Sequence, residues 1–113
     1  MTARLASSIL VTALLRRAEA QGGFGAVLAR GDSSGGAILV VLLEKGSNPR
    51  LLERVLGAEG LYHWAFAVNR AAGEAGDMRE TIERRRRFDP DLWVVELDTP
   101  SAEHFAAEMN EMD

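Results

Sequence analysis

The densest concentration of charge in the sequence is a run of four arginines, Arg84–Arg87. Such a run can contact nucleic acid or another anionic partner. Successive residues of a helix point about 100° apart, so the four guanidinium groups would surround a helix axis instead of forming one cationic face. Glu80 and Glu83 each lie four residues before an arginine of the run, a spacing that favours ion pairs on an exposed helix. A binding site and a solvated helix end both remain open.

A second candidate site combines the aspartates of Asp89-Pro90-Asp91 with a histidine, His63. Carboxylates two residues apart can bind a cation or act as acid and base, and a nearby histidine would suit a small enzyme. Aspartates beside proline also stabilise turns by accepting backbone hydrogen bonds, and a zinc site needs three or four ligands. We predict no catalytic residue, no metal and no cofactor. Asp89, Asp91, Trp93 and His63 are kept as candidate binding residues.

Two glycine-rich segments imitate functional motifs. Gly31-Asp32-Ser33-Ser34-Gly35-Gly36 is similar to the segment around the nucleophile of chymotrypsin-like proteases, but an extra serine breaks the spacing and no histidine precedes His63. We interpret it as a turn between two strands. Gly22-Gly23-Phe24-Gly25 follows an expected helix and precedes a strand, the reverse of the order in which a helix N-terminus binds phosphate. It is predicted to end the helix.

Composition bounds the remaining chemistry. The chain has 113 residues, of which 47% are hydrophobic and 27% charged, as expected for a single domain over residues 1–113. It contains no cysteine, which excludes disulfides, thiolate metal sites and a cysteine nucleophile within this sequence. The net charge of −4 gives a mean field that repels nucleic acid and anionic membranes. Nucleic acid is therefore a disfavoured partner, and no membrane partner is expected.

Hydrophobic periodicity and turn residues predict an α+β fold with the order α-β-β-β-β-α-β-α. The expected helices are 4–20, 78–87 and 102–109, and the expected strands are 24–30, 36–44, 50–56, 61–68 and 92–98. Segment 50–56 alternates poorly and is compatible with a short helix as well. The unbroken apolar run 37–43 is expected to be a central strand, and Ser101 is expected to begin the last helix as its cap. Turns are expected at 31–35, 46–49 and 57–60, and Asn69–Gly76 is expected to be a loop before an Asp77 helix cap. Because most strands follow one another as hairpins, we expect a mostly antiparallel sheet of about five strands with helices packed on one face.

The helix expected at 4–20 carries its polar side chains in one narrow stripe. Ser8, Thr12 and Arg16 follow one another at intervals of four, and most of the remaining surface is apolar. So wide an apolar arc is typical of a helix buried on more than one side, here against the sheet and against another subunit. Polar residues interrupt the apolar run and Arg16-Arg17 follows it, so we expect no cleaved export signal and predict a cytoplasmic protein.

A family resemblance rests mainly on one segment in the second half of the chain. It reads Arg85-Arg86-Arg87-Phe88-Asp89-Pro90-Asp91-Leu92-Trp93-Val94-Val95-Glu96, and it resembles the signature of a family of small alphaproteobacterial proteins labelled domain of unknown function 1491. Similar residues of that family correspond to Leu14-Leu15-Arg16-Arg17, Gly23-Phe24, Arg30-Gly31-Asp32 and Gly36-Ala37-Ile38. The resemblance covers nearly the whole chain and implies a bacterial cytoplasmic protein. It implies no activity and no catalytic residue.

Three functions are compatible with the sequence. The one we favour is a non-enzymatic protein-interaction or binding module with an unknown protein partner, where a homodimer formed through helix 4–20 is one form of the interaction. The second is a binder of an anionic partner or nucleic acid through Arg79 and Arg84–Arg87. The third is a small enzyme that uses His63 with Asp89 or Asp91. Absence of enzymatic activity is the expectation.

Overall fold

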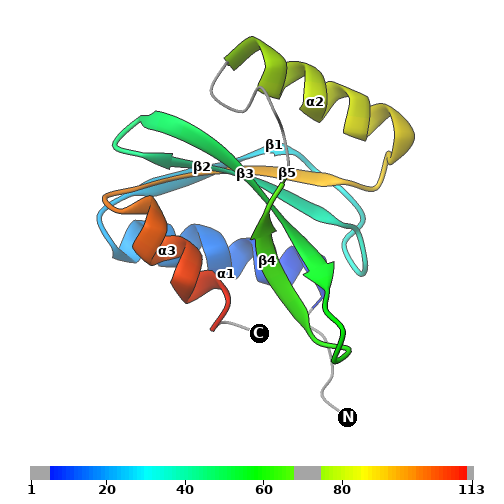
Figure 1. Cartoon of the computed structure of the whole chain (residues 1–113), viewed down its shortest axis with the longest axis horizontal. Helices are drawn as coiled ribbons and strands as arrows, with labels where there is room; N and C mark the ends of the chain where they lie inside the picture. Colours follow the sequence, from blue (N-terminus) through cyan, green and yellow to red (C-terminus); the bar gives the residue numbers. More distant parts are fainter. Residues whose placement is uncertain (1–5, 68–74, 112–113) are drawn as a thin grey trace.

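The computed structural model describes residues 6–67 and 75–111. Within these residues the chain forms three helices and five strands in the predicted order (Figure 1). The helices are α1 (Ser7–Ala20), α2 (Ala75–Phe88) and α3 (Ala102–Met109). The strands are β1 (Phe24–Ala29), β2 (Ile38–Glu44), β3 (Ser47–Leu56), β4 (Tyr62–Phe66) and β5 (Trp93–Thr99). Segment 50–56 is therefore part of a strand.

The strand order in the sheet is β1-β5-β2-β3-β4, so β5 lies between two strands that are consecutive in the chain. β5 runs antiparallel to β1 and parallel to β2. The pairs β2–β3 and β3–β4 are antiparallel. The sheet is thus mixed, and the prediction of a mostly antiparallel sheet is wrong. The error arises because the loop between β1 and β2 crosses the start of β5 instead of turning back as a hairpin.

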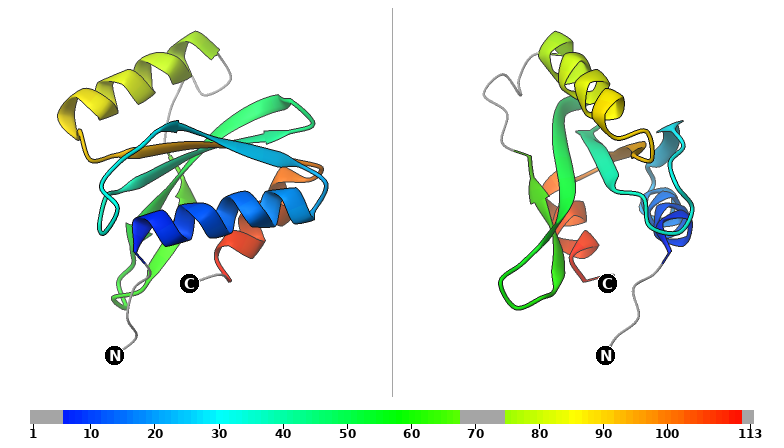
Figure 2. Two further views of the ribbon diagram at one scale, coloured as in Figure 1. Left: turned by 180° about the vertical axis from the view of Figure 1, so that it is seen from behind. Right: turned by 90° about the vertical axis from the view of Figure 1, so that its right-hand side faces the viewer.

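Helices cover both faces of the sheet, which corrects the expectation that they pack on one. α1 and α3 lie together on one side and α2 lies on the other (Figure 2). β2 explains how this is possible, because its side chains are apolar in both directions: Val40 packs toward α1 and α3, whereas Leu39 and Val41 pack toward α2. The unbroken apolar run was predicted to be a central strand, and the structure confirms it.

Local turn and cap positions follow the sequence closely, with two differences. The β2–β3 turn lies at Lys45 and Gly46, which both have positive φ, whereas 46–49 was expected. α2 begins at Ala75, so Asp77 is inside the helix and does not cap it; its side chain and residues 68–74 lie outside the described residues. The cap of α3 is as predicted, because the hydroxyl of Ser101 accepts a hydrogen bond from the His104 backbone N–H.

Among the residues that the structure describes, α1 is buried on one side only. Its buried residues are Ser7, Leu10, Val11, Leu14 and Ala18, and they face the sheet. Ile9, which points away from them, is 55% exposed. Most of the apolar arc recognised in the sequence is therefore used inside the fold. No helix in the described part of the chain is long and apolar enough to cross a membrane.

Candidate functional site

Two segments far apart in sequence meet at the start of β5. They are the crossover loop 31–37 and the segment 89–93, and together we call them the clasp. The backbone N–H of Asp32 donates to the carbonyl of Asp91 (3.0 Å), and the indole Nε1 of Trp93 donates to the carbonyl of Asp32 (2.7 Å). The backbone N–H of Trp93 donates to the carbonyl of Ala37 (2.8 Å). The clasp thereby holds β5 between β1 and β2.

The glycines of the clasp permit this close approach. A Cβ atom at Gly31 or Gly36 would overlap the carbonyl oxygen of Asp91. The loop also caps the N-terminus of α1, because the carbonyls of Ser34 and Ser33 accept hydrogen bonds from the first N–H groups of that helix, those of Ser7 and Ser8. The serines that imitate a protease motif therefore contribute backbone to a crossover loop, where a turn was predicted.

The paired aspartates take part in the same clasp. A side-chain oxygen of Asp89 accepts from the Asp91 backbone N–H (3.1 Å), and the Asp89 carbonyl accepts from Leu92 (3.2 Å). Trp93 is 2% exposed and packs in the α1 and α3 core, with the guanidinium of Arg30 5.4 Å from its ring centroid. In this arrangement Asp89 and Trp93 bond to the chain itself, and for Asp89 this is the turn alternative left open by the sequence.

The arginine run divides into one partnered and three exposed side chains. Arg85 turns toward the sheet, where its guanidinium lies 3.3 Å from the carboxylate of Glu53 on β3. Arg84, Arg86 and Arg87 are exposed at the end of α2. Because consecutive helical residues diverge, the run supplies positive charge around the helix end and no single cationic face.

His63 lies apart from the paired aspartates in the sheet. It is exposed on β4, whereas Asp89 and Asp91 precede β5, and β3 and β2 lie between those strands. The other histidine, His104, contacts the carboxylate of Glu108 (2.7 Å) on the surface of α3. Residues 6–67 and 75–111 contain no group of three or more histidine and acidic side chains placed to hold a metal ion.

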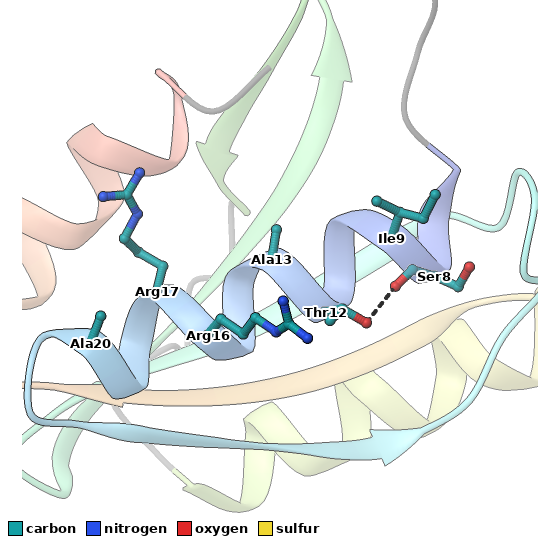
Figure 3. Close-up of a pocket in the computed structure, with 7 residues that line it drawn as sticks. All are labelled: Ser8, Ile9, Thr12, Ala13, Arg16, Arg17 and Ala20. Atoms are coloured by element: carbon teal, nitrogen blue, oxygen red, sulfur yellow. Dashed lines mark hydrogen bonds between the residues drawn. The ribbon is translucent and has the colours of Figure 1, made fainter.

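The outer face of α1 carries a surface depression. It is a shallow groove of about 640 Å³ (Figure 3), lined by Ser8, Ile9, Thr12, Ala13, Arg16, Arg17 and Ala20. Arg17 leans toward α3 and pairs with Glu108 (3.7 Å). A second pocket of about 160 Å³ lies at the N-terminal end of α1, beside Arg54 and Tyr62. The groove is open and mixed in character, which suits a polypeptide surface better than a small enclosed ligand.

The two edges of the sheet differ in how their backbone groups are covered, and the sequence analysis did not predict this difference. At the β4 edge, the side-chain amide of Asn110 bonds to both backbone groups of Trp64, at 2.6 Å to the N–H and 3.4 Å to the carbonyl. At the β1 edge, no hydrogen bond from another described segment reaches Phe24–Ala29 from outside the sheet. The signal was available in the sequence, because Phe24–Ala29 contains no charged residue and no proline.

β1 also exposes large apolar side chains. Phe24 is 64% exposed, Leu28 53% and Val27 37%. An uncovered, uncharged and apolar edge strand is a template for pairing with another chain. We call the outer edge of β1 together with the adjoining outer face of α1 the β1 surface.

The comparisons with known proteins identify a family without an activity. The family model "Protein of unknown function (DUF1491)" matches residues 5–107. The crystal structure of a DUF1491 family protein from Caulobacter crescentus CB15 shares 35% identity at a TM-score of 0.81, covering 90% of this chain and 94% of that chain. The solution structure of protein Atu0922 from A. tumefaciens shares 32% identity at a TM-score of 0.76, covering 91% and 92%. No curated protein matches the chain. The chain belongs to the DUF1491 family of proteins of unknown function.

Proposed function

We propose that this protein is a non-enzymatic interaction module that binds another polypeptide through the β1 surface. The observation that carries this proposal is the uncovered edge of β1, with Phe24, Val27 and Leu28 exposed beside unpaired backbone groups. An added strand satisfies those backbone groups, and the exposed side chains supply apolar contacts on either face of the sheet. The proposed compartment is the cytoplasm, supported by Arg16-Arg17 directly after the apolar run.

The groove on α1 extends this surface beyond the strand. α1 packs against β1 and β5, so its outer face adjoins the free edge. A stable complex buries about 800 Å² on each partner, which is more than a six-residue strand edge offers. Contacts to Ile9 and Thr12 on α1 would supply further area.

The two alternative functions have less support from the geometry. An anionic partner would meet Arg84, Arg86 and Arg87 spread around a helix end, on a chain with a net charge of −4. An enzyme based on His63 would need that exposed side chain to meet Asp89 or Asp91, which belong to a different part of the sheet. The β1 surface requires no rearrangement of the fold.

Selection of peptides tests the proposed function. A library of random eight-residue peptides is displayed on phage and selected on the protein, which is immobilised at low density so that its copies do not meet. Selected peptides should protect the amides of β1 from hydrogen exchange and should lose binding to the variant Ala26→Lys, which puts charge on the edge. The matched variant Leu61→Lys changes an apolar side chain that is 70% exposed on the β3–β4 hairpin and should bind as the wild type does.

Three results would reject the proposal. They are failure to select any peptide, equal binding of the selected peptides to both lysine variants, and protection that maps to another element. Nucleic acid that co-purifies with the protein and is lost when Arg84, Arg86 and Arg87 are neutralised would favour the anionic partner instead.

A further inference from the structure

We propose that the polypeptide that pairs with β1 is the β1 of a second copy, so that two sheets join into one of ten strands, five from each copy. This inference rests on the proposed function and names its partner. The two β1 strands would run antiparallel about a two-fold axis perpendicular to the sheet. Such an isologous contact uses the same surface on both copies and closes with the dimer.

The side-chain pattern of β1 selects one register for this pairing. A two-fold axis perpendicular to the sheet keeps each residue and its copy on the same face of the sheet, and directly opposite residues of paired strands also share a face. One residue of β1 must therefore lie directly opposite its own copy, with the axis midway between the two. The ladder of β1 is regular from Phe24 to Val27 and irregular between Val27 and Ala29, so the pairing uses the regular part. With the axis at Ala26, Gly25 of one copy lies opposite Val27 of the other, and the missing side chain at Gly25 leaves room for Val27, which is 37% exposed. The small side chain of Ala26 then meets itself at the centre.

The position of α1 agrees with the spacing that this sheet would impose. α1 packs against both β1 and β5, so its axis lies near the line between those strands. Strands lie about 4.8 Å apart, which places that line about 4.8 Å from the dimer axis and the two α1 helices about 10 Å apart. Packed helices lie about 8 to 10 Å apart. The two helices would therefore touch.

The stripe of Ser8, Thr12 and Arg16 lies on the side of α1 away from Arg17, which points toward α3 (Figure 3). Ser8 and Thr12 are short and suit such a contact, whereas Arg16 is a long, exposed side chain whose charged end must stay in solvent. The hydroxyl of Thr12 is already satisfied by the carbonyl of Ser8 (3.0 Å), so it can approach an apolar neighbour at little cost. Gly25 contributes as well, because a Cβ there would lie 2.8 Å from the Leu15 side chain of α1, which would have to shift.

The opposite edge explains why the assembly should stop at two. β4 presents its outward backbone groups at Trp64 to Asn110 of the same chain. An open β4 edge would allow β1 of a further copy to add there, and head-to-tail addition does not close. Because Asn110 covers the centre of β4, a further copy cannot add its β1 there, and pairing of β1 with β1 is the way in which two copies can join their sheets.

Sedimentation equilibrium over a wide concentration series tests the proposal on the full chain. The wild type should show twice the mass of the chain, and Leu61→Lys should match it. Ala26→Lys and Ala26→Glu each place like charges opposite one another at the axis, so each should raise the dissociation constant at least about 100-fold. An equimolar mixture of the two variants should restore the dimer as a heterodimer. This rescue requires both variants to be folded, which circular dichroism and the thermal midpoint of each will establish.

The outcomes separate this inference from the proposed function. A wild type that stays monomeric up to its solubility limit overturns the second copy as partner. The same conclusion follows from a dimer that both charge variants retain, or from a mixture of the variants that stays monomeric. If peptides still protect β1 in any of these cases, the proposed function stands with a different polypeptide. If neither peptides nor a second copy engage β1, both are rejected.

Discussion

The two faces of the sheet are built very differently, although the same central strands supply both. Among the described residues, fifteen buried side chains form the core under α1 and α3, and seven of them come from the helices. The core under α2 has six buried side chains, and Met78 is the only described one from the helix. The energy that holds the fold together is therefore concentrated on the α1 and α3 face, and α2 is held by few contacts.

Polar contacts follow the same division. α3 is tied to the sheet at both ends, because the carboxylate of Glu44 accepts from the Ala102 backbone N–H (2.9 Å) and Asn110 bonds to Trp64. On the other face, the ion pair of Arg85 with Glu53 ties α2 to the sheet. The β1 surface lies beside the well-packed face, so a partner would dock on the more rigid half of the molecule.

The largest predicted effect is the loss of Phe105 from the well-packed face. Phe105 is fully buried, so Phe105→Ala removes apolar contacts and leaves a cavity that costs about 3 to 5 kcal/mol in unfolding free energy. Phe88→Ala is the matched control, since Phe88 is 83% exposed at the end of α2. It should change stability by no more than about 0.5 kcal/mol. Urea denaturation followed by circular dichroism measures both, and similar losses would contradict the burial described for the two side chains.

A methionine on each face gives a direct test of the comparison. Met109 of α3 is fully buried and Met78 of α2 is 4% exposed, yet their surroundings differ in packing. We expect Met109→Ala to cost about 4 kcal/mol and Met78→Ala about 2 kcal/mol, the upper and lower parts of the range for such truncations, because the thinly packed face can collapse around the change. Equal losses in urea denaturation would show that α2 contributes as much to stability as α3.

Elements formed by neighbouring residues were predictable from the sequence, and arrangements made by distant residues were not. The 57–60 turn, the central position of β2 and the Ser101 cap each depend on a local pattern, and the structure has them where expected. The insertion of β5 and the placement of α2 on the opposite face depend on contacts such as Asp32 with Asp91, which periodicity does not encode.

The candidate site was harder to predict for the same reason. Residue types identified Asp89, Trp93 and the arginines as distinctive, and the structure accounts for Asp89, Trp93 and Arg85 by bonds within the chain. The β1 surface is defined by what does not cover it, and that depends on where Asn110 and α1 lie in space. The local feature of the sequence that indicated this surface was the absence of charged residues from Phe24–Ala29.

A smaller effect is expected at the covered edge of the sheet. Asn110→Ala removes the acceptor for the Trp64 backbone N–H and the donor to its carbonyl, which should cost about 1 kcal/mol for the lost hydrogen bonds. Asn110→Asp keeps the acceptor at the same position and should lose less. The alanine variant also exposes a second edge, so we expect larger assemblies in sedimentation at high concentration. A variant as stable and as monodisperse as the wild type would show that Asn110 does not protect β4.

The smallest effect concerns the ion pair of Arg85 with Glu53, which ties α2 to the sheet. Both side chains are partly exposed, 38% for Arg85 and 29% for Glu53, so the pair should contribute only about 0.5 kcal/mol. A double-mutant cycle with Arg85→Gln and Glu53→Gln isolates that coupling, and it should shrink as salt is raised. Arg86→Gln, one residue further along the exposed part of the run, is the matched control and should leave stability unchanged. A coupling well above 1 kcal/mol would mean that polar contacts compensate for the small apolar core under α2. The two faces of the sheet would then differ in the type of contact that stabilises them more than in the amount of stabilisation.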